Sequence, residues 1–209
     1  MQVWDISPPV SSRSPVFPGD TPYAQQWVAR IAPGCPVNVS AVTLSPHIGA
    51  HADAPLHYAD DAPAIGAVDL APYLGRCRVI YALGCGPLVT IDHLAHAQRG
   101  LPPRVLVRTC AQAAVDRWDD DFAAFAPETV TWLAGMGVRL IGIDTASVDP
   151  AASKTLASHQ QLLRLDLRVL ENLVLDDVPE GDYELIALPL KWIDADASPV
   201  RAILRELRP

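Results

Sequence analysis

The chain has 209 residues, 50% hydrophobic and 19% charged, and this balance excludes a largely disordered protein. A length in this range predicts one domain, spanning 1–209, that buries a core without needing disulfides. The formal net charge of −8 lacks the broad positive field that binds phosphate backbones, so we do not expect nucleic acid as a partner.

The chain shows no export or membrane signal. Residues 1–6 contain neither a basic segment nor an apolar stretch, so we expect no signal peptide. The longest uncharged apolar run, between Arg78 and Asp92, is too short to cross a bilayer. The cysteines, none in a CxxC pair, are Cys35, Cys77, Cys85 and Cys110. We expect buried free thiols in a cytoplasmic protein, with no membrane as partner.

Strand signals dominate the chain. Seven segments are rich in β-branched or aromatic residues and are bounded by Gly, Pro or Asp. In chain order the predicted strands are Gln2–Ile6, Gln25–Ile31, Val37–Leu44, Arg78–Leu83, Arg104–Thr109, Val138–Ile143 and Tyr183–Leu188. Twenty prolines limit long helices over most of the chain, so short strands and stiff loops are expected.

Helical signals are fewer. The predicted helices are Ile91–Gln98, Glu128–Met136 and Thr155–Leu165. The middle one has the clearest ends, because Pro127 suits a first helical position and glycines follow its last turn. A helix leading into a strand is an α/β packing unit, so the pattern favours layers of sheet with a few covering helices.

Three of the six histidines lie within a short stretch that also contains an aspartate. They are His47, His51 and His57, with Asp53 between them. Neutral imidazole nitrogens and carboxylate oxygens are the usual ligands of catalytic zinc and similar divalent metals. The plain alternative is two polar residues on a helix face, but an intervening glycine and proline disfavour a helix. The spacing predicts one short loop wrapping a metal ion.

A second ligand group is less clear from the residues alone. His159 is the natural distal candidate, because Asp166 and Glu171 follow it closely. Taken singly, His159 is an ordinary helix histidine and Glu171 a solvated carboxylate. His93 and His96 are expected to be solvated on the exposed face of a short helix.

The segment from His47 to His57 reads His-x-Gly-x-His-x-Asp-x-Pro-x-His and resembles the signature of the cyclase-like metal-dependent hydrolases. Ala50 stands where the wider family usually has Thr. The form Gly-Ala-His-Ala-Asp-Ala-Pro-Leu-His resembles the bacterial kynurenine formamidases, or arylformamidases, in particular. Further agreement extends along the chain, in segments 4–7, 17–22, 143–150 and 170–173.

The resemblance implies a strand-rich, swivelling β/β/α fold of the α/β class. It implies that His47, His51 and Asp53 bind one metal, and that Asp53, His159 and Glu171 bind a second. Zinc, two ions per subunit, is expected, although manganese and iron suit the same ligands.

The resemblance also implies a reaction. Two metals bridged by carboxylates can generate hydroxide near neutral pH and polarise a carbonyl, as acyl cleavage requires. His57 matches the position of the proton shuttle, and Phe17 matches an aromatic position that contacts substrate. The implied activity is the hydrolysis of N-formyl-L-kynurenine to L-kynurenine and formate in tryptophan degradation, by a homodimer whose N-terminal segment contributes to the neighbouring pocket.

Two other functions stay open from the sequence. The first is hydrolysis of another aryl amide, an isatin-like lactam or an ester by the same metal motif. The second is a non-catalytic metal-binding protein, although structural zinc sites are usually rich in thiolates. Tyr58 and the acids Asp60 and Asp61 are candidates for holding an amino-acid head group, and they would distinguish these substrates.

Overall fold

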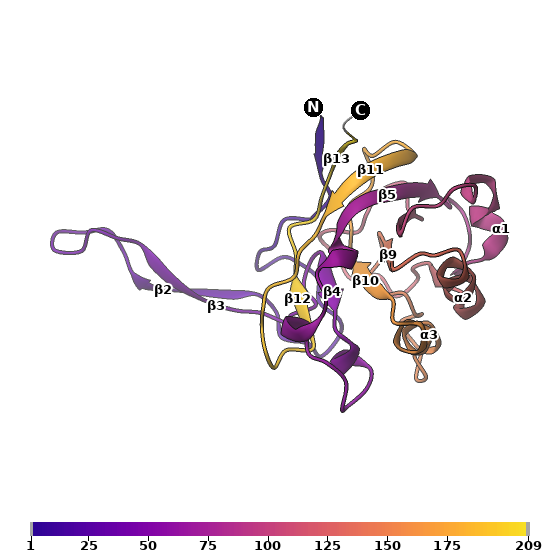
Figure 1. The fold of residues 1–209 in the computed structure, drawn as a ribbon. Coiled ribbons are helices and arrows are strands. Elements are labelled where there is room, and N and C mark those ends of the chain that lie inside the picture. Colours follow the sequence, from indigo (N-terminus) through magenta and orange to yellow (C-terminus); the bar gives the residue numbers. More distant parts are fainter. Residues whose placement is uncertain (1, 208–209) are drawn as a thin grey trace.

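The computed structural model describes residues 2–207, and its centre is a nine-stranded mixed sheet (Figure 1). In spatial order the strands are β1 (Val3–Asp5), β13 (Ile203–Glu206), β11 (Gly181–Ile186), β5 (Leu74–Tyr81), β7 (Arg104–Arg108), β9 (Leu140–Ile143), β10 (Arg168–Glu171), β4 (His51–Asp53) and β12 (Ala197–Pro199). Strands β5, β7, β9 and β10 run parallel, and antiparallel strands flank them on both sides. The sheet curls into a half-barrel.

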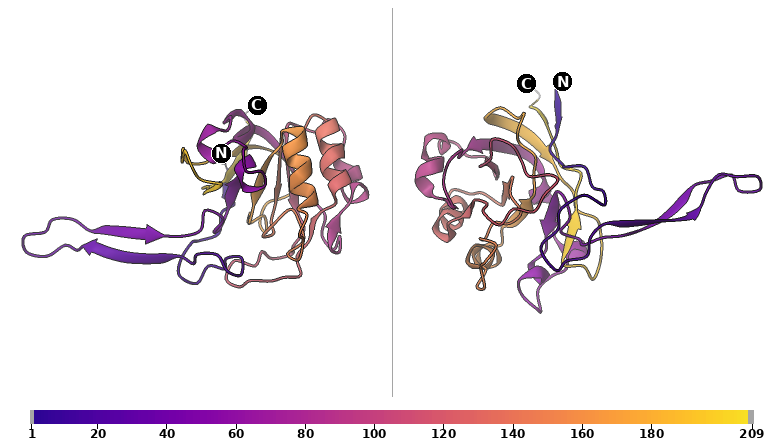
Figure 2. Two further views of the ribbon diagram at one scale, coloured as in Figure 1. Left: turned by 90° about the horizontal axis from the view of Figure 1, so that it is seen from below. Right: turned by 180° about the vertical axis from the view of Figure 1, so that it is seen from behind.

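Smaller elements surround this sheet. The described residues form the hairpin β2 (Ala24–Ala29) and β3 (Val39–Thr43), the pair β6 (Leu88–Val89) and β8 (Ala124–Phe125), the helices α1 (Ile91–Leu94), α2 (Pro127–Gly135) and α3 (Ala157–Leu165), and the 3₁₀ turns η1 (Pro55–His57), η2 (Ile65–Ala67), η3 (Ala71–Tyr73) and η4 (Ala95–Ala97). The three helices cover one side of the sheet, whereas the hairpin extends away from the body (Figures 1 and 2).

The central strands are buried on both faces, and their side chains alternate between two cores. In β7, Val105 and Val107 contribute to the core beneath the helices, and Leu106 contributes to the core on the opposite face. Adjacent residues of β5, Val79 and Ile80, divide in the same way. Parallel strands enclosed on both faces are expected to be this apolar throughout. The two cores hold the central strands rigidly in place.

The structure confirms the α/β class and all seven predicted strands, with shifted ends, as β1, β2, β3, β5, β7, β9 and β11. The three predicted helices are also present, but the first divides into α1 and the 3₁₀ turn η4. Six short strands were not predicted: β4, β6, β8, β10, β12 and β13. They have two to four residues each, which is too short for a periodic pattern to register unless the flanking residues extend it.

One correction concerns the histidine-rich stretch. It is not a single loop, because His51–Asp53 forms β4 inside the sheet, between β10 and β12. His47 precedes this strand in a turn, and His57 follows it in η1. The prediction failed because the strand has only three residues, and two of them, His51 and Asp53, are polar side chains that the fold nevertheless buries.

Other expectations were confirmed in part. The four cysteines are free, but only Cys77 is buried. His96 is exposed and forms an ion pair with Glu180, as expected of a surface histidine. His93 is instead half-buried, and its Nδ1 accepts a hydrogen bond from the backbone N–H of Thr90 at 3.0 Å, which closes the first turn of α1. Among residues 2–207, no helix has both the length and the apolar character that a membrane span requires.

Candidate metal centre

Strand register brings three of the predicted ligands together. His51 and Asp53 are alternate residues of β4, so their side chains point to the same face of the sheet. Glu171 is the last residue of β10 and pairs directly with His51 across the antiparallel β4–β10 ladder. All three are at most 3% exposed. Pairing of two short strands therefore places an imidazole and two carboxylates side by side in a buried site.

The α3 helix supplies His159, which is 2% exposed. The Asp149 carboxylate accepts hydrogen bonds from the backbone N–H groups of Ser158 and His159, at 2.9 and 3.0 Å, and so satisfies donors in the first turn. Its Oδ2 also lies 2.7 Å from Nδ1 of the His159 ring. Asp149 thus fixes both the start of the helix and the orientation of the ring. Sequence analysis did not assign Asp149 a role.

The turn before β4 explains the glycine between the two histidines. Gly49 has φ +64°, and a Cβ built there would lie 2.8 Å from the side chain of Val10. A residue with a side chain would therefore be both strained and obstructed. The Gly49 carbonyl accepts the Nδ1–H of His51 at 2.9 Å, which leaves Nε2 of that ring facing the site.

The two carboxylates lie between the histidines. Oδ1 of Asp53 is 3.1 Å from Nδ1 of His47 and 3.4 Å from Nε2 of His51, whereas its Oδ2 is 3.3 Å from Nε2 of His159. Glu171 repeats the pattern, with Oε2 3.3 Å from His51 and Oε1 3.5 Å from His159. Each carboxylate therefore presents one oxygen to each half of the site.

The buried atoms of this cluster fit a divalent cation. Nε2 of His51 and Oδ1 of Asp53 are buried without a hydrogen-bond partner among residues 2–207, a costly arrangement unless another group binds them. His47, His51 and Asp53 can each bring one ligand atom within 4.8 Å of the others. The donor set of imidazole and carboxylate, without thiolate, is typical of a catalytic rather than a structural site.

The electrostatics of the site also favour a bound cation. Burial opposes protonation of His47 and His51, but the adjacent carboxylates outweigh it. Asp196 and Asp53 raise the pKa of His47 to about 10, and Asp53 and Glu171 raise the pKa of His51 to about 9. Protons thus occupy the ligand nitrogens of the metal-free site, and a bound cation takes their place.

The proton-shuttle candidate lies beside this cluster. His57 is in η1, directly after β4, and its side chain is 32% exposed. Its ring centroid is 4.3 Å from that of His47 and 5.9 Å from that of His159. His57 thus borders both halves of the site while it stays open to the pocket.

Asp196 is a site residue that sequence analysis missed. Its Oδ2 lies 2.9 Å from Nε2 of His47 and 3.4 Å from Nδ1 of His57. The hydrogen bond from His47 lowers the pKa of the Asp196 carboxyl to about 2. No local motif marks this residue. The pairing of β12 with β4 alone brings it to the histidines, so the sequence offers no signal of its role.

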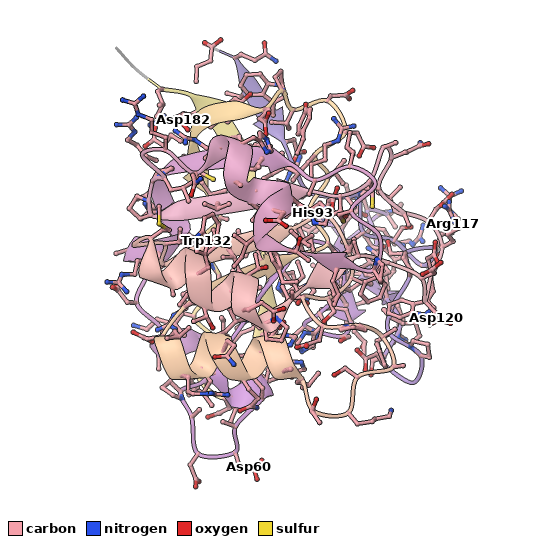
Figure 3. All side chains as sticks on the ribbon, turned by 90° about the vertical axis from the view of Figure 1, so that its right-hand side faces the viewer. Asp60, His93, Arg117, Asp120, Trp132 and Asp182 are labelled. Carbon is pink, nitrogen blue, oxygen red and sulfur yellow. The ribbon has the colours of Figure 1, made fainter. Side chains whose placement is uncertain are left out.

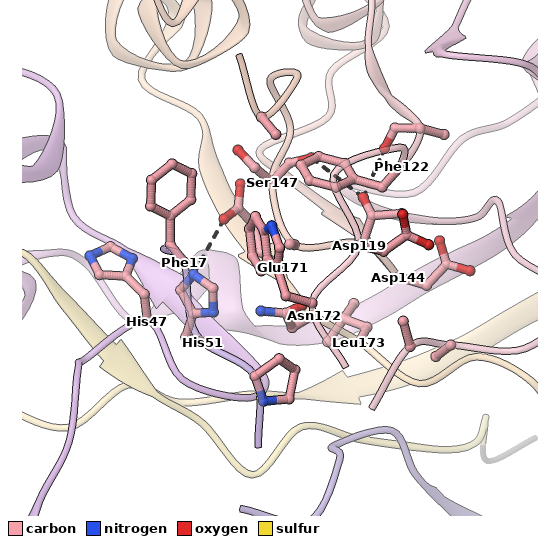
Figure 4. Close-up of a pocket in the computed structure, with 18 of the residues that line it drawn as sticks. Phe17, His47, His51, Asp119, Phe122, Asp144, Ser147, Glu171, Asn172 and Leu173 are labelled. Atoms are coloured by element: carbon pink, nitrogen blue, oxygen red, sulfur yellow. Dashed lines mark hydrogen bonds and ion pairs between the residues drawn. The ribbon is translucent and has the colours of Figure 1, made fainter. Parts of the chain in front are cut away.

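The cluster lines a pocket with a volume of about 610 Å³, which is in the range of small-molecule sites (Figure 4). Phe17, 49% exposed, also lines this pocket, and its ring meets that of Trp118 edge to face at 5.3 Å. The Trp118 ring also meets that of Phe122, at 6.2 Å. Three aromatic side chains, Phe17, Trp118 and Phe122, therefore border the pocket that the metal cluster lines.

The residues suggested for an amino-acid head group lie outside the lining of this pocket. Tyr58, Asp60 and Asp61 do not line the pocket, and Asp60 lies at the tip of a separate loop, away from Arg117 (Figure 3). The loop of residues 110–123 lines the pocket instead, through Arg117, Trp118 and nearby acids. Asp166, the other acid near His159, forms an exposed ion pair with Arg168 outside the site.

Known proteins resemble the chain over its whole length. The model of the family described as "Putative cyclase" matches residues 4–150. A kynurenine formamidase from Bordetella pertussis is 71% identical over 206 residues, which cover 99% of each chain. A kynurenine formamidase from Delftia acidovorans is 68% identical over 206 residues, covering 99% of this chain and 98% of the relative.

Solved structures share the fold. One titled a potential metal-dependent hydrolase with cyclase activity has a TM-score of 0.87 at 26% identity, covering 100% of this chain and 99% of the other. An isatin hydrolase bound to a product analogue, thioisatinate, has a TM-score of 0.79 at 20% identity, covering 97% and 91%, and so shows the fold alone. With a family match over most of its length and full-length relatives of such high identity, the chain belongs to the cyclase family, among the bacterial kynurenine formamidases.

Proposed function

We propose that this chain hydrolyses N-formyl-L-kynurenine to L-kynurenine and formate, a step of tryptophan degradation. The observation that carries the proposal is 71% identity with a kynurenine formamidase over the full length, together with a cluster of imidazole and carboxylate groups beside a pocket. The chain is therefore an amide hydrolase that acts on a non-peptide C–N bond.

The metal cofactor is assigned to the buried cluster. His47, His51 and Asp53 would hold one ion, and Asp53, His159 and Glu171 a second, with zinc as the metal in each position. When bound, the metal acts as a Lewis acid that polarises the formyl oxygen and lowers the pKa of water. The two-sided placement of both carboxylates supports this assignment, because each presents an oxygen to both groups of histidines.

The residues of the chain supply the remaining steps. His57 takes a proton from the attacking water and gives it to the anilinic nitrogen as the C–N bond breaks. A formyl carbon carries only hydrogen beside its oxygen and nitrogen, so attack at the crowded, buried centre meets little steric resistance. Phe17 packs against the aryl ring and orients it, as its exposed ring at the pocket wall allows.

A related activity is the second candidate. Isatin hydrolases share the fold at 20% identity, and opening an isatin lactam also breaks the acyl C–N bond of an amide whose nitrogen carries an aryl ring. A ratio of kcat/KM for N-formyl-L-kynurenine to that for isatin separates the two. We expect the formamide to be preferred, and a preference for isatin would reassign the substrate. A non-catalytic metal-binding role is disfavoured, because His57 stays open to the pocket beside the donors.

We also propose that the chain works as a homodimer in the cytoplasm. The β2–β3 hairpin exposes apolar side chains, including Val28 at 69% and Ile31 at 66%, which a second copy would cover. Four free cysteines suit a reducing compartment.

The assignment of His57 is tested by its replacement. His57→Ala should lower kcat by about 10²- to 10⁴-fold, the usual contribution of a positioned acid–base group, and leave the metal content unchanged. Kynurenine absorbance measures turnover, and elemental analysis measures the metal. Full activity in this variant would exclude the proton-shuttle role without affecting the substrate assignment.

A further inference from the structure

Asp196 is held in place by the sheet rather than by its own side chain. It immediately precedes β12, whose first residue, Ala197, pairs with Asp53 of β4. Its carbonyl accepts the backbone N–H of Ala54 at 2.8 Å, on the residue that follows β4. The ladder therefore fixes residue 196 beside the point where the chain leaves β4 and enters the turn that carries His57.

One carboxylate oxygen serves two rings. Oδ2 of Asp196 lies 2.9 Å from Nε2 of His47 and 3.4 Å from Nδ1 of His57. An ionised carboxylate only accepts hydrogen bonds, so both of these nitrogens carry hydrogen. In the neutral rings the opposite nitrogens, Nδ1 of His47 and Nε2 of His57, are then left with lone pairs. For His47 this nitrogen faces Asp53, at 3.1 Å.

We propose that Asp196 is a positioning residue for the hydrolysis, because it sets the tautomer of His57 so that Nε2 is available to take up a proton. The same carboxylate holds His47 with Nδ1 directed at the metal cluster. The proton-shuttle role of His57 rests on the proposed function. Its tautomer does not, because it depends only on the contact with Asp196. Asp196 thus contacts both a candidate metal ligand and the group that moves the proton. It lies outside the signature motif and outside residues 4–150, which the family model matches.

The first test reads the tautomer in the metal-free protein. Nitrogen-15 NMR of the imidazoles shows which ring nitrogen carries hydrogen, and His57→Ala identifies the signal of His57. We expect the Nδ1–H form in the native protein at a pH where the ring is neutral. Asp196→Ala should return it to the Nε2–H form that free imidazole side chains prefer in water. Asp194→Asn, an exposed acid two residues away, is the matched control and should change nothing.

The second test uses the leaving group. A ring that cannot deliver its proton should hinder the departure of a basic aniline more than that of a weakly basic one. With saturating zinc, Asp196→Ala should lower kcat for N-formyl-L-kynurenine by about 10- to 100-fold. The loss should be larger for 4-methoxyformanilide than for 4-nitroformanilide. Asp196→Asn, which keeps an acceptor oxygen, should recover part of the activity.

The outcomes separate the possible roles. An unchanged His57 tautomer in Asp196→Ala, or an equal loss for every leaving group, would overturn the positioning role. Loss of one bound metal ion from this variant would also overturn it, by making Asp196 a ligand. If the native, zinc-loaded chain forms no kynurenine, the proposed function fails, and the NMR result still decides the tautomer.

Discussion

Every histidine that faces the metal cluster is oriented through its other ring nitrogen. The Gly49 carbonyl accepts a hydrogen bond from His51, the Asp149 carboxylate from His159 and the Asp196 carboxylate from His47. Such partners fix the tautomer and make the ligand nitrogen more basic. Gly49, Asp149 and Asp196 therefore determine how firmly the three imidazole rings are held in the orientation that metal binding needs.

Asp149 allows a test of this arrangement without touching a ligand. Asp149→Ala should weaken zinc binding by about 10- to 100-fold, because the His159 ring loses its anchor. The variant should also lose about 1 kcal/mol of stability, since the first turn of α3 loses the acceptor for two N–H groups. Calorimetric titration measures the affinity, and Asp166→Asn is the exposed control. Unchanged zinc affinity in Asp149→Ala would contradict the account.

The raised histidine pKa values predict how pH acts on metal binding. His47 and His51, with pKa values of about 10 and about 9, are protonated near neutral pH in the metal-free protein. Zinc must displace these protons, so the apparent affinity for zinc should rise with pH. The rise should end above the two pKa values, where both imidazoles are already neutral. Titrations in buffers of different ionisation enthalpy measure the protons released. Binding without proton release near neutral pH would contradict this prediction.

At the scale of elements, three short strands carry the site. The pairing of β4 with β10 and β12 sets His51 against Glu171, and Asp196 near His57. A slip of one residue in either ladder would turn the ligands to the opposite face. The loop of residues 110–123 contributes differently, since its side chains border the pocket without touching the cluster.

Trp118 is the aromatic residue of this loop that stands against Phe17. Trp118→Ala should raise KM for N-formyl-L-kynurenine by about 5-fold, as expected when one aromatic contact worth about 1 kcal/mol is lost. Its effect on kcat should be small, because the side chain does not reach the donors. Trp118→Phe retains an aromatic ring and should lie close to the native protein. Steady-state kinetics measure KM and kcat for each variant. An unchanged KM in Trp118→Ala would exclude a substrate contact.

At the scale of the whole molecule, the sequence predicted the longer strands and helices but not which segments of the chain lie side by side. Seven strands and the α2 and α3 helices were predicted because their patterns are long enough to register. The motif at His47 indicated a metal site from local spacing alone. The residues alone marked His159 and Glu171 only as distal candidates, and the family resemblance assigned them as ligands, since more than a hundred residues separate them from the motif. Asp196 was missed because strand pairing, which no local pattern encodes, brings it to the site.

The protruding hairpin predicts how the molecule associates. Val28→Glu should convert the expected dimer to a monomer, because a charge on this exposed apolar surface would be buried at the interface. The control is Met136→Glu, an exposed residue at the end of α2, and it should stay dimeric, because α2 and the hairpin lie on opposite sides of the molecule (Figure 1). Light scattering with size-exclusion chromatography measures the mass. A monomeric native protein would rule out the dimer.

The central claim is a metal-dependent formamidase that uses His57 to move the proton. The most direct measurement is the rate of kynurenine formation by the purified, zinc-reconstituted chain, beside a chelator-treated sample and His57→Ala. The account predicts rapid turnover that is lost on chelation, restored by zinc and reduced about 10²- to 10⁴-fold by the substitution. A chain that binds zinc fully but releases no kynurenine would contradict it.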